Sequence, residues 1–197
     1  TPALNYTGTS VITVIVSDNA LTDTTKFNFT VINVNDAPVI TAVSNESTDE
    51  ETEESIVLSA SDVDGDALTY SASSDTSAVS VTIISNTLKL TPALNYTGTS
   101  VITAIVSDNA LTDTTKFDFT VINVNDAPVI TAVSNESTDE ETENSIVLSA
   151  SDVDGDALTY IASSDTSAVA VTVSTNTLKL TPALNYTGTS VITVIVS

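Results

Sequence analysis

Carboxylate side chains at short, regular spacing are the feature of this sequence that could carry chemistry. The string DVDGD stands at residues 62–66 and recurs at residues 152–156, and further acids fill residues 49–54. Single aspartates, Asp108 among them, lie in other polar strings. Carboxylate and amide oxygens, in the absence of sulfur or imidazole, favour Ca²⁺ or Mg²⁺ over transition metals. The sequence therefore predicts cation binding before any other chemistry.

The composition excludes several classes of function. The chain carries 26 acidic residues against four lysines, a formal net charge of −22, so it repels nucleic acid and anionic lipid. Cysteine and histidine are absent, which rules out disulfides, zinc centres and histidine-based catalysis. No apolar run approaches the length of a membrane span. We expect neither a nucleic-acid partner nor membrane insertion.

Catalysis by paired carboxylates has little support. A glycosidase needs a cleft in which two carboxyl groups acquire well-separated pKa values. The acids of this chain fall in loop segments between short apolar segments, and no pocket is evident from the pattern. We expect a protein that is not an enzyme.

The chain repeats itself with a period of 90 residues. Residues 1–90 and 91–180 differ at eight positions, and the opening string TPALNYTGTS returns a third time at Thr181. The domain edges are best placed at the two Asn-Asp-Ala-Pro strings, because proline cannot donate to a strand ladder and suits a strand start after a linker. We therefore predict the C-terminal part of a preceding repeat in 1–35, a complete repeat in 36–125, and a repeat without its last strand in 126–197. An internal segment of a longer repeating protein is the expectation.

Within the complete repeat the pattern predicts only β-structure. Segments are short, rich in β-branched residues and separated by Asp, Asn, Ser and Gly, which is typical of an all-β sandwich. Residues 114–124 alternate between apolar and polar side chains, as expected of a strand with one buried face. The predicted strands are 39–43, 55–60, 68–72, 78–84, 87–90, 100–107 and 114–124.

Alternating strand directions place the acidic loops at two ends of the sandwich. The loop containing residues 62–66 and the loop at Asp108 fall at the end where the chain enters, beside Asp36. The acids at 49–54 fall at the end where it leaves. In a tandem array the junction near Asp126 then gathers Glu50 or Glu51 with Asp126, Asp152 and Asp154, and a Ca²⁺ ion with six to eight oxygen ligands would reverse the repulsion among them.

The set NDAPV, DVDGDALTY, PxxNYTG and SDN resembles the bacterial cadherin-like tandem repeats of large secreted adhesins. The resemblance covers the whole chain and implies tandem seven-stranded Greek-key β-sandwiches of cadherin or immunoglobulin type, joined end to end. It departs from the cadherin repeat at residues 94–97, where Leu-Asn-Tyr-Thr replaces a Leu-Asp-Arg-Glu string, so the junction is expected to hold fewer or weaker ions. The metal ligands that it implies are Asp36, Asp62, Asp64, Asp108, Asp126, Asp152 and Asp154, with Glu50 or Glu51 from the acidic loop.

Alternative interpretations stay open at these positions. Residues 62–66 could be a β-turn that binds nothing. They do not form an EF-hand, because glycine stands at the fourth place and Ser73 at the twelfth. Most acids at 49–54 could be a solvated loop, since Glu54 becomes Asn144 in the next copy.

These observations predict structural spacer repeats of a long extracellular adhesin or surface filament, secreted and bacterial, stiffened by calcium at its junctions. The expected partners are calcium, neighbouring repeats and other copies of the chain. Two alternatives remain: a fibre subunit that assembles by strand exchange or lateral packing, and a module that binds carbohydrate or a partner surface, for which exposed aromatic side chains would be the sign.

Overall fold

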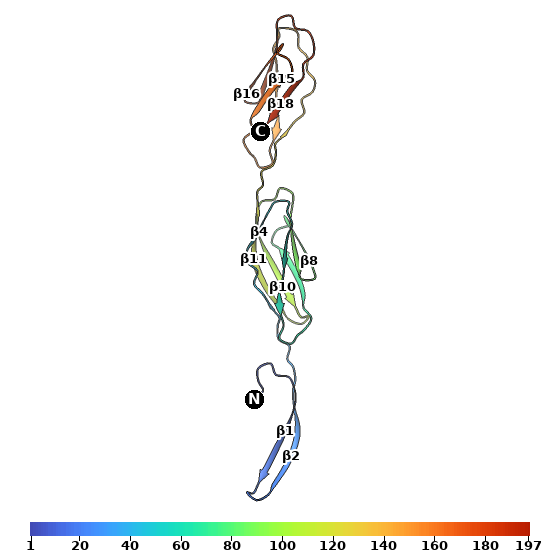
Figure 1. Cartoon of the computed structure of the whole chain (residues 1–197), viewed down its shortest axis with the longest axis vertical. Coiled ribbons are helices and arrows are strands. Elements are labelled where there is room, and N and C mark those ends of the chain that lie inside the picture. Colours follow the sequence, from blue (N-terminus) through green and yellow to red (C-terminus); the bar gives the residue numbers. More distant parts are fainter. The chain divides into compact units, whose positions relative to one another are not determined.

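The computed structural model describes residues 1–197 and contains strands, turns and irregular segments without a helix (Figure 1). The chain divides into two compact units, Thr1–Asn123 and Val124–Ser197. The first unit contains both the hairpin segment 1–35 and the sandwich of residues 36–123. The all-β fold class that the sequence predicted is confirmed.

Two layers of strands make up the sandwich of residues 36–123. One layer is a four-stranded sheet in the order β4-β11-β10-β7. The other contains the pair β3-β6 and the three-stranded sheet β5-β9-β8. The strands are β3 (Val39–Ile40), β4 (Glu46–Asp49), β5 (Glu54–Val57), β6 (Ala60–Ser61), β7 (Thr69–Ser74), β8 (Val79–Ile84), β9 (Thr87–Pro92), β10 (Gly98–Ser107) and β11 (Thr112–Ile122).

The core between these layers follows from the alternation of side chains along each strand. On β11, Phe117, Phe119 and Val121 are buried, while the intervening positions are exposed or partly exposed. Leu88 and Leu90 of β9 are fully buried in the same cluster. Each layer thus turns one face inward, and the loops that carry the acids extend beyond this core.

The first strand of the sandwich is divided between the two layers. β3 pairs antiparallel with β6, whereas β4 pairs parallel with β11. The sequence predicted a single strand over 39–43 and missed β4, because the segment ESTD has neither apolar alternation nor strong β-propensity. Its strand conformation comes from the backbone of β11.

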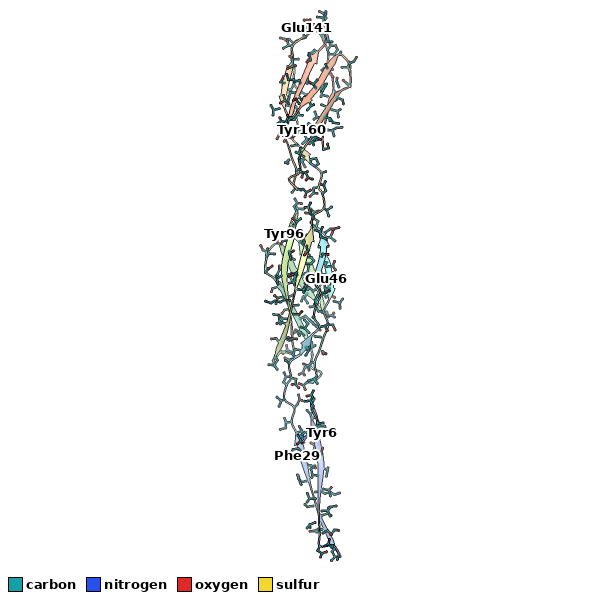
Figure 2. All side chains as sticks on the ribbon, turned by 90° about the vertical axis from the view of Figure 1, so that its left-hand side faces the viewer. Tyr6, Phe29, Glu46, Tyr96, Glu141 and Tyr160 are labelled. Atoms are coloured by element: carbon teal, nitrogen blue, oxygen red, sulfur yellow. The ribbon has the colours of Figure 1, made fainter.

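Residues 1–35 form a hairpin of β1 (Gly8–Ser17) and β2 (Thr22–Val31). Its register matches that of β10 and β11, since Ile12 faces Phe27 as Ile102 faces Phe117. Figure 2 shows Phe29 on this two-stranded ribbon. Phe29 is 50% exposed, whereas its counterpart Phe119 is fully buried.

Residues 124–197 repeat much of this pairing. Antiparallel pairs join β12 to β14, β15 to β18, and β17 to both β13 and β16. Leu148 and Leu178 are buried, as are Leu58 and Leu88 in the first unit. These residues contain no counterpart of β4 or β11. The strands are β12 (Val129–Ile130), β13 (Asn144–Val147), β14 (Ala150–Ser151), β15 (Tyr160–Ser164), β16 (Val169–Ser174), β17 (Thr177–Pro182) and β18 (Ile192–Val196).

Candidate metal centre

The loop between β6 and β7 is organised around one carboxylate. Oδ1 of Asp62 accepts hydrogen bonds from the backbone N–H groups of Asp64 (2.8 Å) and Asp66 (3.3 Å). Gly65 has φ of +78°, a conformation that costs other residues strain but glycine almost none. An aspartate that bonds to the backbone two residues on is a standard way to close a turn. The loop is therefore a defined turn that holds its acids in place.

This turn brings three carboxylates together. Oxygens of Asp62, Asp64 and Asp66 all lie within 4.8 Å of one another. At such distances two unit charges repel by about 1 kcal/mol in water and by several times that near a protein surface. The arrangement is therefore costly unless a cation or protons neutralise it.

One oxygen of the group has no partner. Oδ2 of Asp62 is buried and makes no hydrogen bond within the protein. A buried acceptor without a donor loses the hydration that it has in the unfolded chain, and an anionic one loses more. A divalent cation bound between the three carboxylates would satisfy this atom, so the residues present fit a hard, oxygen-seeking ion such as Ca²⁺.

The segment that enters the sandwich is attached to the same loop. The backbone N–H of Asp36 donates a 2.8 Å hydrogen bond to Oδ2 of Asp64. Beside it, Nδ2 of Asn35 donates to Oδ2 of Asp108 at 2.8 Å. The structure thus brings Asp36 to the loop through its backbone.

Asp108 has a structural task of its own. Its Oδ1 accepts hydrogen bonds from the backbone N–H groups of Ala110 (2.7 Å) and Leu111 (2.6 Å). The Leu111 amide, followed by the Asn35 side chain and the Ala110 amide, lowers the pKa of Asp108 below its ordinary value. The carboxylate is held ionised by protein donors, and it is not a member of the three-acid group.

The second copy of the loop reproduces the hydrogen bonds and the carboxylate cluster of the first. Oxygens of Asp152, Asp154 and Asp156 again lie within 4.8 Å of one another. Oδ1 of Asp152 accepts from the backbone N–H of Asp154 (2.9 Å) and of Asp156 (3.2 Å). The backbone N–H of Asp126 donates to Oδ2 of Asp154 at 2.6 Å, as Asp36 does to Asp64. The geometry is therefore a property of the repeat.

Glu50 and Glu51 lie in the turn that follows β4. The backbone N–H of Glu50 donates to the carbonyl of Ile122 at 2.9 Å, and the residue is buried. Glu51 is exposed and has φ of +60°, which places it at the corner of the turn. Backbone bonding to β11 thus fixes the position from which these two side chains extend.

Two carboxylates and one amide of the site were absent from the predicted ligand set. Asp66 and Asp156 complete the three-acid groups, and Asn35 holds Asp108. The alternation of aspartates in DVDGD could have indicated Asp66 and Asp156, because a tight turn brings alternate residues close together. No local pattern could have indicated the contact of Asn35, which crosses 73 residues of sequence.

The chain belongs to the bacterial Ig domain family, whose model matches residues 35–120 and 125–197. This assignment supports the predicted tandem β-sandwiches of cadherin or immunoglobulin type. Bacterial Ig domains are typical of extracellular and surface proteins, and domains of this kind are typically not enzymes. A search of curated proteins found no match.

One solved structure supports the same fold class. The chain is similar to the human protocadherin-24 EC1-2 fragment in its second crystal form, with a TM-score of 0.53 and 22% identity over 83% of this chain and 94% of that one. The chain is also similar to an endo-fucoidan hydrolase of glycoside hydrolase family 107, with a TM-score of 0.42 and 20% identity over 100% of this chain. The chain spans about a third (34%) of that hydrolase.

The structure has no helix of sufficient length and apolarity to cross a bilayer.

Proposed function

We propose that this chain consists of structural spacer repeats of a long extracellular adhesin or surface filament, and that Ca²⁺ stiffens the junctions between its domains. In this proposal the protein is secreted and has no catalytic activity. The tandem repetition of one small sandwich supports a spacer role. Strands rise by about 3.3 Å per residue, so each added copy lengthens the array, and it presents the same surface as the copy before it.

The observation that carries the calcium proposal is the buried, unpartnered Oδ2 of Asp62 within the three-acid group. A cation held among the three carboxylates would satisfy that oxygen and offset the repulsion between the charges. A divalent cation is therefore the neutralising partner that these residues favour. The repetition of the loop in the second unit extends the proposal to both copies.

We assign the central ligands to Asp62 and Asp64, with Asp66 added, and to Asp152 and Asp154 with Asp156. Asp36 and Asp126 are bonded to these loops through their backbone N–H groups, and Asp108 is bonded to Asn35, the residue before Asp36. We propose all three as ligands or as groups that orient ligands. Glu50 and Glu51 are the proposed contribution of the preceding domain. When bound, the ion supplies positive charge and fixed coordination.

Ordering of the loop would be transmitted to the linker. Because the Asp36 N–H is bonded to Asp64, and the Asp126 N–H to Asp154, a cation that fixes these aspartates also fixes the peptide that enters each sandwich. Restricted motion of that peptide is the proposed physical basis of a stiffer array.

The experiment combines small-angle scattering with thermal unfolding of the 197-residue chain, in calcium and in chelator. We expect a longer maximum dimension and a higher Tm in calcium. An unchanged Tm would contradict calcium binding, whereas a raised Tm with unchanged scattering would contradict only the stiffening of junctions. Magnesium at the same concentration distinguishes a specific calcium site from general screening of a highly acidic chain.

The alternative of a carbohydrate-binding module has less support. Such a module would present aromatic side chains at its surface. Within residues 36–123, Phe117 and Phe119 are buried, and Tyr70 and Tyr96 pack against the core. The other alternative, a fibre subunit, requires copies of net charge −22 to associate, and electron microscopy of the chain in calcium would test it.

A further inference from the structure

Two Asp-Gly pairs occur in the chain, Asp64-Gly65 and Asp154-Gly155, and each lies in an acidic loop. The backbone nitrogen that follows an aspartate can attack the carboxyl carbon of that side chain and close a five-membered ring. A Cβ on the following residue shields its own nitrogen from this attack, and glycine has no Cβ. An Asp-Gly pair is therefore reactive wherever the fold leaves its nitrogen and its carboxyl group free to meet.

The fold leaves the nitrogen of Gly65 free. Gly65 is exposed and lies outside the strands. The N–H groups on either side, of Asp64 and Asp66, are both bonded to Oδ1 of Asp62, whereas the Gly65 N–H makes no hydrogen bond within the protein. A Cβ added to Gly65 would meet no atom within 4 Å, so the peptide has room to turn towards the carboxyl group. Neither pairing nor packing withholds this nitrogen.

Asp108 shows the opposite arrangement. The nitrogen that follows it, in Asn109, donates a 3.1 Å hydrogen bond to Oγ of Ser107. The Asp108 carboxylate itself accepts the N–H groups of Ala110 and Leu111. Both reacting groups are engaged there, and the following residue carries a Cβ. Asp108 is therefore an internal comparison for Asp64 within the same sandwich.

One contact restrains the carboxyl group of Asp64. Its Oδ2 accepts the backbone N–H of Asp36 at 2.8 Å, and this is the only hydrogen bond that the carboxylate makes. To reach the Gly65 nitrogen, the carboxyl group has to turn away from that donor. The bond between the linker and the loop therefore adds to the barrier for ring closure.

We propose that Asp64-Gly65 is a site of spontaneous isomerisation to isoaspartate, and that the bond from Asp36 slows it. In the first step the Gly65 nitrogen bonds to Cγ of Asp64, and the carboxyl hydroxyl leaves with the amide proton as water. In the second step water adds to the main-chain carbonyl carbon of Asp64, and the bond from that carbon to the Gly65 nitrogen breaks. The main chain then runs through Cγ, and the former carbonyl carbon carries the carboxylate. No oxidant, reductant or enzyme takes part.

Isomerisation would release the linker. The product has one more carbon atom in the main chain between residues 64 and 65, and its carboxylate is on a different carbon. The turn at Asp62 depends on the N–H groups of Asp64 and Asp66, and the longer chain cannot keep both bonds, so the three-acid group loses its geometry. This inference goes beyond the proposed spacer function, and only its effect on junction stiffness rests on that function.

The test is incubation of the 197-residue chain in oxygen-18 water with chelator at neutral pH, followed by proteolysis and mass spectrometry. Each passage through the ring leaves one oxygen-18 atom in the residue, and chromatography separates the isoaspartyl peptide from its aspartyl form. We expect label and isoaspartate at residue 64 and neither at residue 108. Absence of label at residue 64, or equal labelling of residues 64 and 108, would overturn the inference.

Two variants separate the chemistry from the restraint, with Asp154-Gly155 as the reference in the same molecule. Asp64→Glu would need a six-membered ring, which closes more slowly, so label at residue 64 should be lost while residue 154 keeps its rate. Asp36→Pro removes the N–H donor. It should raise the labelling rate of residue 64, relative to residue 154, by roughly two- to tenfold, the factor that one hydrogen bond contributes. An unchanged ratio would contradict the restraint.

Circular dichroism establishes whether Asp36→Pro folds. If it does not fold, the unaltered chain in urea provides the comparison, because the bond from Asp36 is absent there. Residue 64 should then be labelled faster in urea than in the folded chain, and an equal rate would contradict the restraint. All rates are measured in chelator, so failure of the calcium proposal would leave them unaffected.

Discussion

Nδ2 of Asn35 donates a 2.8 Å hydrogen bond to Oδ2 of Asp108 and so joins the linker to the loop between β10 and β11. Asp108 is buried, and its other oxygen accepts two backbone N–H groups. These donors stabilise the charged form of the carboxyl group, which is why its pKa lies below the ordinary value. The linker at Asn35 is thereby fixed by a hydrogen bond whose strength depends on ionisation of the Asp108 carboxyl group.

A pH dependence follows from this contact. A carboxyl group whose pKa is lower in the folded state than in the unfolded state adds stability that is fully present above the unfolded pKa of about 3.9. That stability is lost as the pH falls through the lowered pKa of Asp108. We expect Asn35→Ala to raise the pKa of Asp108 and to move acid unfolding to higher pH. Carboxyl titration by NMR measures both, with exposed Asn33→Ala as the control; equal shifts in the two variants would refute the expectation.

Calcium dependence of stability is predicted to disappear from the sandwich of residues 36–123 in Asp62→Asn, while the second copy of the loop, at Asp152, Asp154 and Asp156, keeps its own. In chelator this variant should be at least as stable as the unaltered chain, because one charge leaves a repelling group. In calcium at about 100 times the dissociation constant, the unaltered site should gain about 2.7 kcal/mol and the variant far less. Thermal unfolding with and without chelator measures the difference.

The control for this variant is Asp118→Asn, which places on β11 the residue that β2 carries at Asn28. It removes the same charge from an exposed position away from the loop. If Asp118→Asn abolished the calcium effect equally, the effect would be one of net charge and the loop would not be the site.

Phe119 is predicted to make a large contribution to stability because it is buried. Phe119 is fully buried between the two layers, so Phe119→Ala should cost about 3–5 kcal/mol. Val57, which is 70% exposed on β5, is the control, and Val57→Ala should change stability by less than about 0.5 kcal/mol. Denaturant unfolding followed by circular dichroism provides both values, and similar losses would contradict the burial seen here.

Gly65 is predicted to be required because its backbone has a positive φ, whereas the space around it would accommodate a side chain. An added Cβ would meet no atom within 4 Å, yet φ is +78°. Gly65→Ala should therefore destabilise the loop by about 1 kcal/mol and weaken calcium binding, whereas Gly65→Asn should be milder because asparagine tolerates this region. Calorimetric titration with calcium compares them. Indistinguishable affinities for alanine and asparagine would show that backbone strain is not the cause.

Much of the fold and part of the site could be predicted from the sequence. The alternation in 114–124 indicated β11 and its buried Phe117 and Phe119, because side-chain direction in a strand has a period of two. The DVDGD string indicated a cluster of carboxylates, because a tight turn is a local structure. Of the predicted ligands, Asp62 and Asp64 lie in one group, while Asp108 forms its own turn beside the linker.

What the sequence determined by itself is the strand pattern and the acidic turn, since both depend on residues that are neighbours in the chain. Tertiary structure decided the rest. Pairing with β11 gives the polar segment of β4 its strand conformation, and the second layer of the sandwich buries Phe119. The contact of Asn35 with Asp108 was decided in the same way. Hydrogen bonding between distant segments and burial of apolar surface are properties of the assembled sandwich, so no local pattern in the sequence determines them.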